Sequence, residues 1–292
     1  MGTDTEKNKI CRGTLYLTAT PIGNLADITD RAKKILSEVD FIAAEDTRNT
    51  ARLLKSYSIT KPLTSYHEHN MRTATPKIIE RLQRGEACAL VTDAGMPAIS
   101  DPGEELVREC IENGVPVTVV PGSCAAVSAL ALSGMSTRRF SFEGFLSGTT
   151  KDRRERLEKI KFDDRTLIFY EAPHRLRETL ALMRDVLGER ETAIVKELTK
   201  LNERVLHTTL LRACEFYIER EPRGEYVIIV EGAQAGAERA ESFFSDMTVS
   251  EHVAFYEKSG MSRMDAMKST AKDRGVPKGE IYKSILAEEK DD

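Results

Sequence analysis

The sequence predicts an α/β protein made of two α/β domains with a cleft between them, followed by a small helical appendage. Up to about residue 231, short apolar runs rich in β-branched residues alternate with amphipathic stretches, which is typical of βαβ units and a largely parallel sheet. Loops bearing glycine, proline and aspartate follow several of these runs, at the edge of the sheet where ligands bind. Beyond residue 240 the strand pattern stops and only helical spacing remains.

The first domain is expected over residues 10–133. Its predicted strands are compact apolar runs, and they cover residues 14–20, 41–44, 87–92 and 115–120. Its predicted helices carry apolar side chains three and four residues apart, and they cover residues 29–39, 76–84, 104–112 and 123–133. The last of these helices consists mostly of small residues, which allow a flat nucleoside to lie against the backbone.

The second domain is expected over residues 134–233, with its boundary in the segment 133–139. The predicted strands are residues 165–170, 192–197, 204–208 and 226–231. The predicted helices are residues 151–160, 175–187 and 210–220. Short spacings between the strands indicate a mixed sheet rather than a wholly parallel one.

The appendage is expected over residues 241–292, after a linker of small residues at 234–240. Helices are predicted at 250–258 and 262–272, and Ser262 with Asp265 has the pattern of a capping box. A third apolar face is formed by Ile281, Ile285 and Leu286. Between residues 258 and 283 there are seven Lys or Arg against three Asp or Glu. Two interpretations stay open: a helix-turn-helix unit with a basic RNA-binding face, and an appendage that only packs.

Composition excludes several classes of protein. The 292 residues are 40% hydrophobic and 31% charged, ordinary for a globular protein and too apolar for long disorder. No apolar run approaches the roughly 18 residues that span a bilayer, and the polar N-terminus lacks the apolar region of a secretory signal. We therefore expect a cytoplasmic protein without a membrane partner. The net charge of −4 argues against a protein that coats nucleic acid along its whole length.

The cysteine and histidine patterns point away from metal binding. The five cysteines contain no C-x-x-C pair, so we expect reduced thiols rather than a disulfide framework or zinc ribbon. His67 and His69 are two residues apart and would share one face of a strand, but no third ligand has clear spacing. No metal is expected.

Three loops after successive strands look built for one extended small molecule: residues 18–24, 92–103 and 119–126. In the second of them, Asp93 is a candidate acceptor for ribose hydroxyls or an amine. Asp101 has two interpretations, as a ligand residue or as the cap of the helix that follows. Segments 169–175, 196–200 and 223–225 occupy the corresponding places in the second domain, which implies a cleft between the halves.

Nine motifs follow one another along the chain: TLYLTATPIGNLADIT, AAEDTRNTARLL, YHEHN, LVTDAGMPAISDPG, VVPGSCAA, FEGFL, RTLIFYEAPHRL, KELTK and RGEYVIIVEG. In this order they resemble the ribosomal RNA small subunit methyltransferase I family of the tetrapyrrole-methylase superfamily. The resemblance covers roughly residues 13–290. It implies two α/β domains, S-adenosylmethionine in the cleft between them, and a homodimer. The implied reaction is 2′-O-methylation of a cytidine ribose in the decoding region of 16S rRNA, within the small ribosomal subunit.

The resemblance also implies a set of cofactor-binding residues, carried over motif by motif: Pro21, Asp93, Ala94, Gly95, Ala98, Cys124, Ala125, Glu171 and Leu198. Where the tetrapyrrole methylases carry G-G-D-P, this chain has Asp93-Ala94-Gly95-Met96, which favours RNA over a corrin or porphyrin substrate. Two alternatives stay open. One is a methylase of a tetrapyrrole or another small molecule, and the other is a non-catalytic RNA-binding module.

Methylation of a ribose hydroxyl needs a group that accepts its proton or a cation that stabilises the alkoxide. The predicted catalytic residues are Asp46, Glu171, Glu197 and Lys196. Residues 45–48 and 66–70 are expected to form the RNA-facing wall, although a fixed ion pair between Asp46 and Arg48 is the competing interpretation. The predicted substrate-binding residues are Arg48, His67, Glu68, Asn70, His174, Arg175, Lys268 and Lys272.

Overall fold

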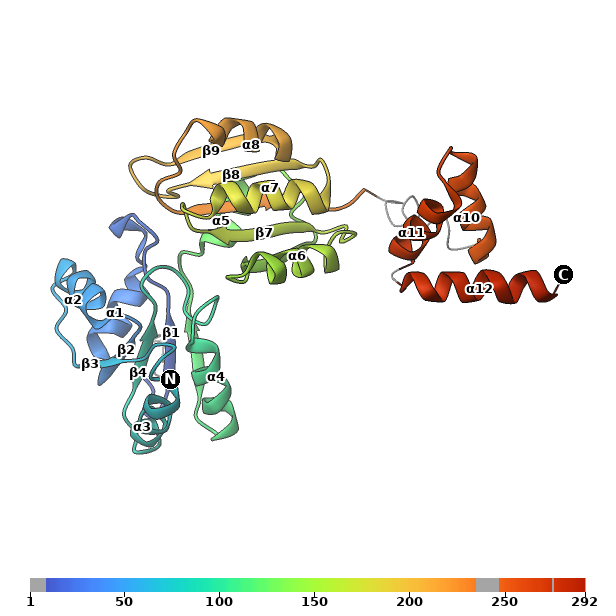
Figure 1. The fold of residues 1–292 in the computed structure, drawn as a ribbon. Coiled ribbons are helices and arrows are strands. Elements are labelled where there is room, and N and C mark those ends of the chain that lie inside the picture. Colours follow the sequence, from blue (N-terminus) through green and yellow to red (C-terminus); the bar gives the residue numbers. More distant parts are fainter. Residues whose placement is uncertain (1–8, 235–246, 275, 292) are drawn as a thin grey trace. The chain divides into compact units, whose positions relative to one another are not determined.

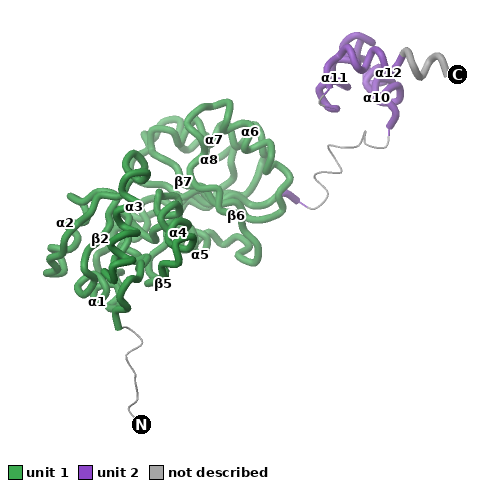
Figure 2. Tube along the Cα trace, turned by 90° about the horizontal axis from the view of Figure 1, so that it is seen from below, with its two compact units in different colours: residues 1–232 green, residues 233–292 purple. Residues whose placement is uncertain are grey.

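A computed structural model describes residues 9–234, 247–274 and 276–291. The chain forms two compact units, Met1–Gly232 and Ala233–Asp292, which are green and purple in Figure 2. The predicted linker at 234–240 lies outside the described residues except for Gln234. Within the described part, no helix is both long and apolar enough to cross a membrane.

The first half of the larger unit contains a five-stranded sheet in which every neighbouring pair of strands is parallel. Its order is β3-β2-β4-β1-β5. The strands are β1 (Leu15–Thr18), β2 (Phe41–Ala44), β3 (Leu63–Ser65), β4 (Cys88–Val91) and β5 (Val117–Val120). All but β3 were expected. β3 is only three half-buried residues at the sheet edge, too short for a periodic signal.

Helices cover both faces of this sheet, as Figure 1 shows for the blue and green part of the chain. They are α1 (Asp30–Glu38), α2 (Thr47–Ser56), α3 (Met71–Gln83) and α4 (Gly103–Glu112), with a short 3₁₀ turn at Leu25–Asp27. Side chains of α1 and α2 pack on one face, and those of α3 and α4 pack on the other. Two expectations need correction. α2 was not predicted, and α3 starts five residues before Pro76 because the N–H groups of Thr73 and Ala74 already bond to the Asn70 carbonyl.

The second half contains a mixed five-stranded sheet of order β6-β7-β10-β8-β9, which confirms the expected mixture. Its strands are β6 (Phe140–Phe145), β7 (Thr166–Glu171), β8 (Glu191–Lys196), β9 (Arg204–Thr209) and β10 (Tyr226–Val230). On one face pack α6 (Thr150–Lys159), α7 (Leu176–Leu187) and α8 (Leu210–Ile218). Alternate strand residues point to the two faces, so that Phe169 and Ile168 enter different hydrophobic clusters.

The small-residue helix α5 (Ala125–Leu132) packs on the other face of this second sheet. Ala126, Ala129 and Leu130 are buried there against residues of β7, β8 and β10. Ile22, from the loop after β1 in the first half, joins the same cluster. The chain therefore crosses from one half to the other between β5 and α5, and the two halves share a core on one side of the cleft.

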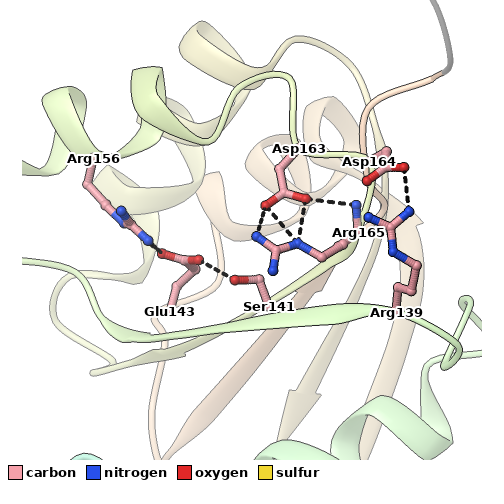
Figure 3. Close-up of polar contacts among 7 residues, drawn as sticks. All are labelled: Arg139, Ser141, Glu143, Arg156, Asp163, Asp164 and Arg165. Atoms are coloured by element: carbon pink, nitrogen blue, oxygen red, sulfur yellow. Dashed lines mark hydrogen bonds and ion pairs between the residues drawn. The ribbon is translucent and has the colours of Figure 1, made fainter.

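A cluster of charged side chains lies on and beside β6, an edge strand of the second sheet (Figure 3). The Glu143 carboxylate is 2% exposed and pairs with the Arg156 guanidinium at 2.6 Å, while it accepts a hydrogen bond from the Ser141 hydroxyl at 2.7 Å. Arg139 bonds to Asp164 at 2.8 Å near the start of the strand. The Arg156 guanidinium neutralises the buried Glu143 carboxylate, so this cluster has a structural explanation.

The described residues of the smaller unit form α10 (Val249–Lys258), α11 (Arg263–Asp273) and α12 (Lys278–Asp291), which confirms the helices expected there. Its core includes Val253, Ala266, Met267, Ala271, Ile281 and Ile285, while the side chain of Leu286 lies outside the described residues. The Ser262 hydroxyl caps α11 by accepting a hydrogen bond from the Asp265 N–H. A reciprocal capping box occurs one helix earlier, between Thr248 and Glu251.

Candidate functional site

A central cavity of about 410 Å³ lies between the two halves of the larger unit. The first half contributes the segments that follow β1, β2, β4 and β5. The second half contributes the ends of β6, β7 and β8 and the start of β10. Ligand sites of open α/β sheets lie at the carboxyl ends of the strands, so the cleft expected from the sequence is present.

The loop over residues 92–103 is held in an uncommon conformation. Gly95 has a φ of +87° and forms a two-way bridge with Thr20, with N···O distances of 2.9 and 3.1 Å. Ala98 and Ser100 have φ values of +65° and +62°, a region that L-residues seldom adopt. Each costs of order 1–3 kcal/mol, and such strain gathers at ligand sites.

Asp101 explains how this loop keeps its shape. Its Oδ1 accepts the N–H of Ala98 at 3.0 Å and of Gly103, the first residue of α4, at 2.7 Å. Asp101 thus binds the first N–H of α4 as the capping interpretation expects, although Pro102 and not Asp101 occupies the N-cap position. Its Oδ2 is buried and has no hydrogen-bond partner among the described residues. Burial also raises the pKa of this carboxyl, although the bonded N–H groups oppose the shift.

The wall of the central cavity is acidic. Five carboxylates belong to it, those of Glu45, Asp93, Asp101, Glu171 and Glu225, while no lysine or arginine lies among the described wall residues. The Thr92 hydroxyl donates to Glu45 Oε2 at 2.8 Å and holds that side chain in place. A cavity with this balance of charge favours a ligand with net positive charge.

The rest of the wall is apolar and includes Ile22, Phe145, Tyr170, Leu198 and Val227. The Tyr170 hydroxyl accepts the Ala126 N–H at 3.0 Å, at the start of α5. Burial raises the pKa of Tyr170 to about 12, so this hydroxyl stays protonated at neutral pH. Apolar and aromatic surface beside carboxylates suits a ligand with a flat ring and a cationic end.

Most of the predicted cofactor residues lie together. The structure places seven of the nine in the cavity wall: Asp93, Ala94, Gly95, Cys124, Ala125, Glu171 and Leu198. Pro21 lines a neighbouring cavity instead. Ala98 lines neither cavity. It has the left-handed conformation described above, and its N–H donates a hydrogen bond to Asp101.

Asp46 was expected to face the substrate, and the structure gives it a different partner. Its Oδ1 accepts the Arg48 N–H at 2.8 Å and caps α2, and its carboxylate pairs with the Arg48 guanidinium at 3.0 Å. These contacts lower the pKa of Asp46 to about 2. The fixed ion pair, the competing interpretation, is confirmed. The preceding residue, Glu45, lines the cavity in its place.

The other predicted catalytic groups differ in position. Glu171 is buried, and its two oxygens accept hydrogen bonds from the Thr179 hydroxyl at 2.5 Å and the Ala172 N–H at 2.8 Å. The pKa of Glu197 is lowered: burial raises it, but the Glu225 N–H and the Lys200 ammonium outweigh that effect. Glu197 and Lys196 are not part of the cavity wall.

The predicted RNA-facing histidines are not on a strand. His67 and Asn70 lie in the turn between β3 and α3, and the ring centroids of His67 and His69 are 5.9 Å apart. The expectation of a shared strand face was wrong because β3 already ends at Ser65. The Asn70 side chain accepts the His67 N–H and donates to the Ser65 carbonyl, so it stabilises the turn. Glu68 lies in the same turn, outside the cavity wall.

Two further predicted substrate residues adjoin β7. Arg175 donates to the carbonyls of Leu146 and Ser147 at 2.7 and 3.0 Å and lies 3.5 Å from the Glu171 carboxylate. These bonds hold the end of β6 against the start of α7, which is a structural task. His174 is exposed and does not line the cavity.

Lys268 and Lys272 belong to the smaller unit, on α11. Lys268 pairs with Asp265 at 2.9 Å while its side chain stays 60% exposed, and Lys272 is also exposed. Lys272 is therefore available to a polyanion, whereas a phosphate would have to compete with Asp265 for Lys268.

Four residues line the cavity without having been named as site residues: Thr92, Phe145, Tyr170 and Glu225. All but Phe145 lie in segments that the sequence placed at the cleft. Sequence reasoning also missed α2, which carries Asn49 and Arg52 next to the cavity. Their signal was available, because all of them fall in or beside the motifs that follow predicted strands. Within the described residues, no cluster of three His, Cys, Asp or Glu side chains is arranged to hold a metal ion.

Comparison with known proteins identifies the family. A sequence model of the tetrapyrrole (corrin/porphyrin) methylases matches residues 14–213. Relatives named ribosomal RNA small subunit methyltransferase I are 49% identical in Halalkalibacterium halodurans and 46% in Bacillus subtilis, over 93% and 92% of this chain and 94% and 93% of theirs. This chain belongs to the ribosomal RNA small subunit methyltransferase I family. Coverage of that extent includes most of Ala233–Asp292, so the sequence similarity extends into the C-terminal helical unit.

Solved structures place this chain in a wider fold class. A uroporphyrin-III C-methyltransferase from Thermus thermophilus is 19% identical, with a TM-score of 0.54 over 75% of this chain and 94% of that one. A cobalt precorrin-4 methyltransferase is 15% identical, with a TM-score of 0.57 over 75% and 95%. At this identity the likeness shows the fold alone, and it confirms the predicted fold class.

Proposed function

We propose that this protein transfers a methyl group from S-adenosylmethionine to the ribose 2′-hydroxyl of a cytidine in the decoding region of 16S rRNA, within the small ribosomal subunit. The observation that carries the proposal is identity of 42–49% with curated rRNA methyltransferases over more than nine-tenths of the chain. The acidic cavity between the two α/β halves supplies a matching site. A cytoplasmic place of action follows from the ribosomal substrate.

The central cavity fits S-adenosylmethionine chemically. This donor carries a sulfonium and an ammonium group against one carboxylate, and five protein carboxylates line the wall. Ile22, Tyr170 and Leu198 offer apolar surface for the adenine. The buried Asp101 Oδ2, which has no partner among the described residues, is a free acceptor for a donor group of the ligand.

When bound, S-adenosylmethionine supplies an electrophilic methyl group. The protein's part is to hold the ribose oxygen in line with that methyl and to take the hydroxyl proton. Glu45 and Asp93 line the wall and accept one side-chain hydrogen bond each, from Thr92 and Asn49. Both therefore keep one oxygen without a side-chain hydrogen bond, whereas each oxygen of Glu171 already accepts one, from the Ala172 N–H and from the Thr179 hydroxyl of α7.

We also propose a homodimer, as the family resemblance implies. Large apolar side chains remain exposed on α5 and on the two adjoining edge strands, with Val127 at 49%, Val119 at 46% and Phe140 at 41%. A second copy covering such residues would remove them from water. Light scattering of the purified chain tests this point, and a monomer at micromolar concentration would contradict it.

Methyl transfer to purified small ribosomal subunits tests the main proposal. We expect radiolabel from S-adenosylmethionine to enter 16S rRNA at one cytidine. The phosphodiester bond that follows this cytidine should resist alkaline hydrolysis, as it does after any 2′-O-methylated nucleotide. Label entering a corrin or uroporphyrinogen instead would support the small-molecule alternative. Absence of S-adenosylmethionine binding by calorimetry would support a non-catalytic RNA-binding module.

A further inference from the structure

A second cavity, of about 360 Å³, adjoins the central cavity, and we call it the side cavity. Its wall combines the loop after β1, helix α2 and the Lys200 side chain. The two cavities have five wall residues in common: Ile22, Thr92, Asp93, Ala94 and Glu225. We propose that the side cavity receives the target nucleotide of the RNA and that Arg52 of α2 binds its phosphate. This proposal rests on the proposed function and adds the place where the substrate binds.

The charge of the two walls distinguishes their ligands. The central cavity has five carboxylates and no cation among its described wall residues, so it repels a phosphate. The side cavity has two cations in its wall, Arg52 and Lys200, against the two shared carboxylates of Asp93 and Glu225, so its wall is balanced in charge where that of the central cavity is acidic. A polyanionic RNA is therefore directed to the side cavity, and a sulfonium donor to the central one. The shared wall keeps the two ligands next to each other.

Of the two cations, Arg52 is the one available to a phosphate. Lys200 Nζ is held by carboxylates on either side, at 3.0 Å from Glu197 and 2.9 Å from Glu225. Arg52 has no carboxylate partner among the described residues. Its contact is Nη1 to the Asn49 Oδ1 at 3.5 Å, which is long for a hydrogen bond. The exposed guanidinium can therefore make a two-pronged contact with a phosphate.

The same comparison explains why Arg48 is a poorer choice. Arg48 lies one helical turn before Arg52, but Asp46 holds its guanidinium at 3.2 and 3.0 Å. A phosphate would have to compete with that carboxylate. The sequence analysis named Arg48, whereas the partners of the two side chains favour Arg52, four residues further along α2.

A short chain of side chains links Arg52 to the shared wall. The Asn49 amide lies between Arg52 and Asp93 and donates to Asp93 Oδ2 at 2.8 Å. Asp93 belongs to both cavity walls. A nucleotide held by Arg52 therefore has its ribose near the wall that the methyl donor also touches. A volume of 360 Å³ suits one nucleotide turned out from its neighbours, not a duplex.

The test compares Arg52→Ala with Lys55→Ala in the full-length protein. Lys55 is an exposed cation of the same helix that does not line the cavity, so it controls for general loss of positive charge. Steady-state methylation of small ribosomal subunits gives KM and kcat, and calorimetry gives the Kd for S-adenosylmethionine. We expect Arg52→Ala to raise KM by about 10- to 100-fold, the effect of one charge-assisted hydrogen bond. Lys55→Ala should change KM less than threefold, and both variants should keep the Kd for the donor within twofold.

Two results would overturn the proposal. One is a KM for Arg52→Ala equal to that for Lys55→Ala, and the other is a loss of donor affinity as large as the rise in KM.

Filter binding of the same variants to small ribosomal subunits needs no methyl transfer, so it decides the question separately from the proposed function. Wild-type protein that binds the subunit but methylates no rRNA would refute the function, while equal binding by the two variants would refute the side cavity as the nucleotide site. Partial recovery of KM in Arg52→Lys supports a phosphate contact.

Discussion

Asp101 performs two separable tasks, and a pair of substitutions distinguishes them. Its Oδ1 holds the strained loop by accepting the N–H bonds of Ala98 and Gly103, while its Oδ2 is buried without a partner among the described residues. Asp101→Ala removes both oxygens. Asp101→Asn keeps an acceptor for the two N–H groups and removes the negative charge.

The expected size follows from the two hydrogen bonds. A hydrogen bond to a charged group contributes about 1.5–3 kcal/mol, so Asp101→Ala should cost about 3 kcal/mol or more. For a unit of 232 residues this lowers Tm by roughly 6–12 °C. Asp101→Asn should keep the wild-type Tm or raise it at pH 7, because it removes a buried charge. Thermal unfolding followed by circular dichroism measures both.

The pH dependence has a definite sign. Because the pKa of Asp101 is raised by burial, the folded state binds its proton more tightly than the unfolded state. Stability from this group is therefore greatest at low pH and falls as pH rises through the raised pKa. Any stability advantage of Asp101→Asn at pH 7 should accordingly shrink toward pH 4.

Donor binding completes the test. If Oδ2 bonds to S-adenosylmethionine, Asp101→Asn should weaken the donor Kd by about 10- to 150-fold without unfolding the protein. Wild-type stability of Asp101→Ala would refute the argument that Asp101 holds the loop. Wild-type donor affinity of Asp101→Asn would refute the contact with the ligand.

Three further substitutions have clear expectations. Asp46→Asn should leave the shape of the pH–rate profile between pH 6 and 8 unchanged, because a carboxyl with a pKa of about 2 does not titrate there; loss of one limb of the profile would contradict this. Thr179→Val removes the hydroxyl that donates to the buried Glu171 and should cost about 1–3 kcal/mol in urea unfolding, with an unchanged midpoint as the contrary result. Charge reversal at Lys268 and Lys272 should weaken binding to small ribosomal subunits and flatten its dependence on salt, whereas unchanged affinity would favour an appendage that only packs.

Most of the fold could be predicted because burial dictates the sequence of a strand that is covered on both faces. β2 and β4 are buried along their whole length, and both were found within one residue of their ends. α2 escaped detection because only Thr50 and Leu54 of its ten residues are buried, too few for an apolar stripe.

The site was predicted less well than the fold because two adjacent polar residues look alike in sequence. Asp46 begins a helix and turns its carboxylate back to the Arg48 N–H, whereas Glu45 is still in the segment that leaves β2 and reaches the cavity. The residue at which α2 starts decides between them. That start depends on a cap, which propensity alone does not locate to a single residue.

The position of α5 explains why most of the residues that the family resemblance names for the cofactor line one cavity, whereas the predicted substrate residues do not. The chain crosses between the halves just before α5, and Gly122 allows this crossing because a Cβ there would lie 2.8 Å from the Ala19 Cβ. Cys124 and Ala125 are thereby fixed at the cavity by backbone geometry, which leaves a readable pattern of small residues. A phosphate contact makes no such demand on the backbone. An exposed arginine on any suitable helix face can supply it, so Arg52 became evident only once the partners of each neighbouring charge were known.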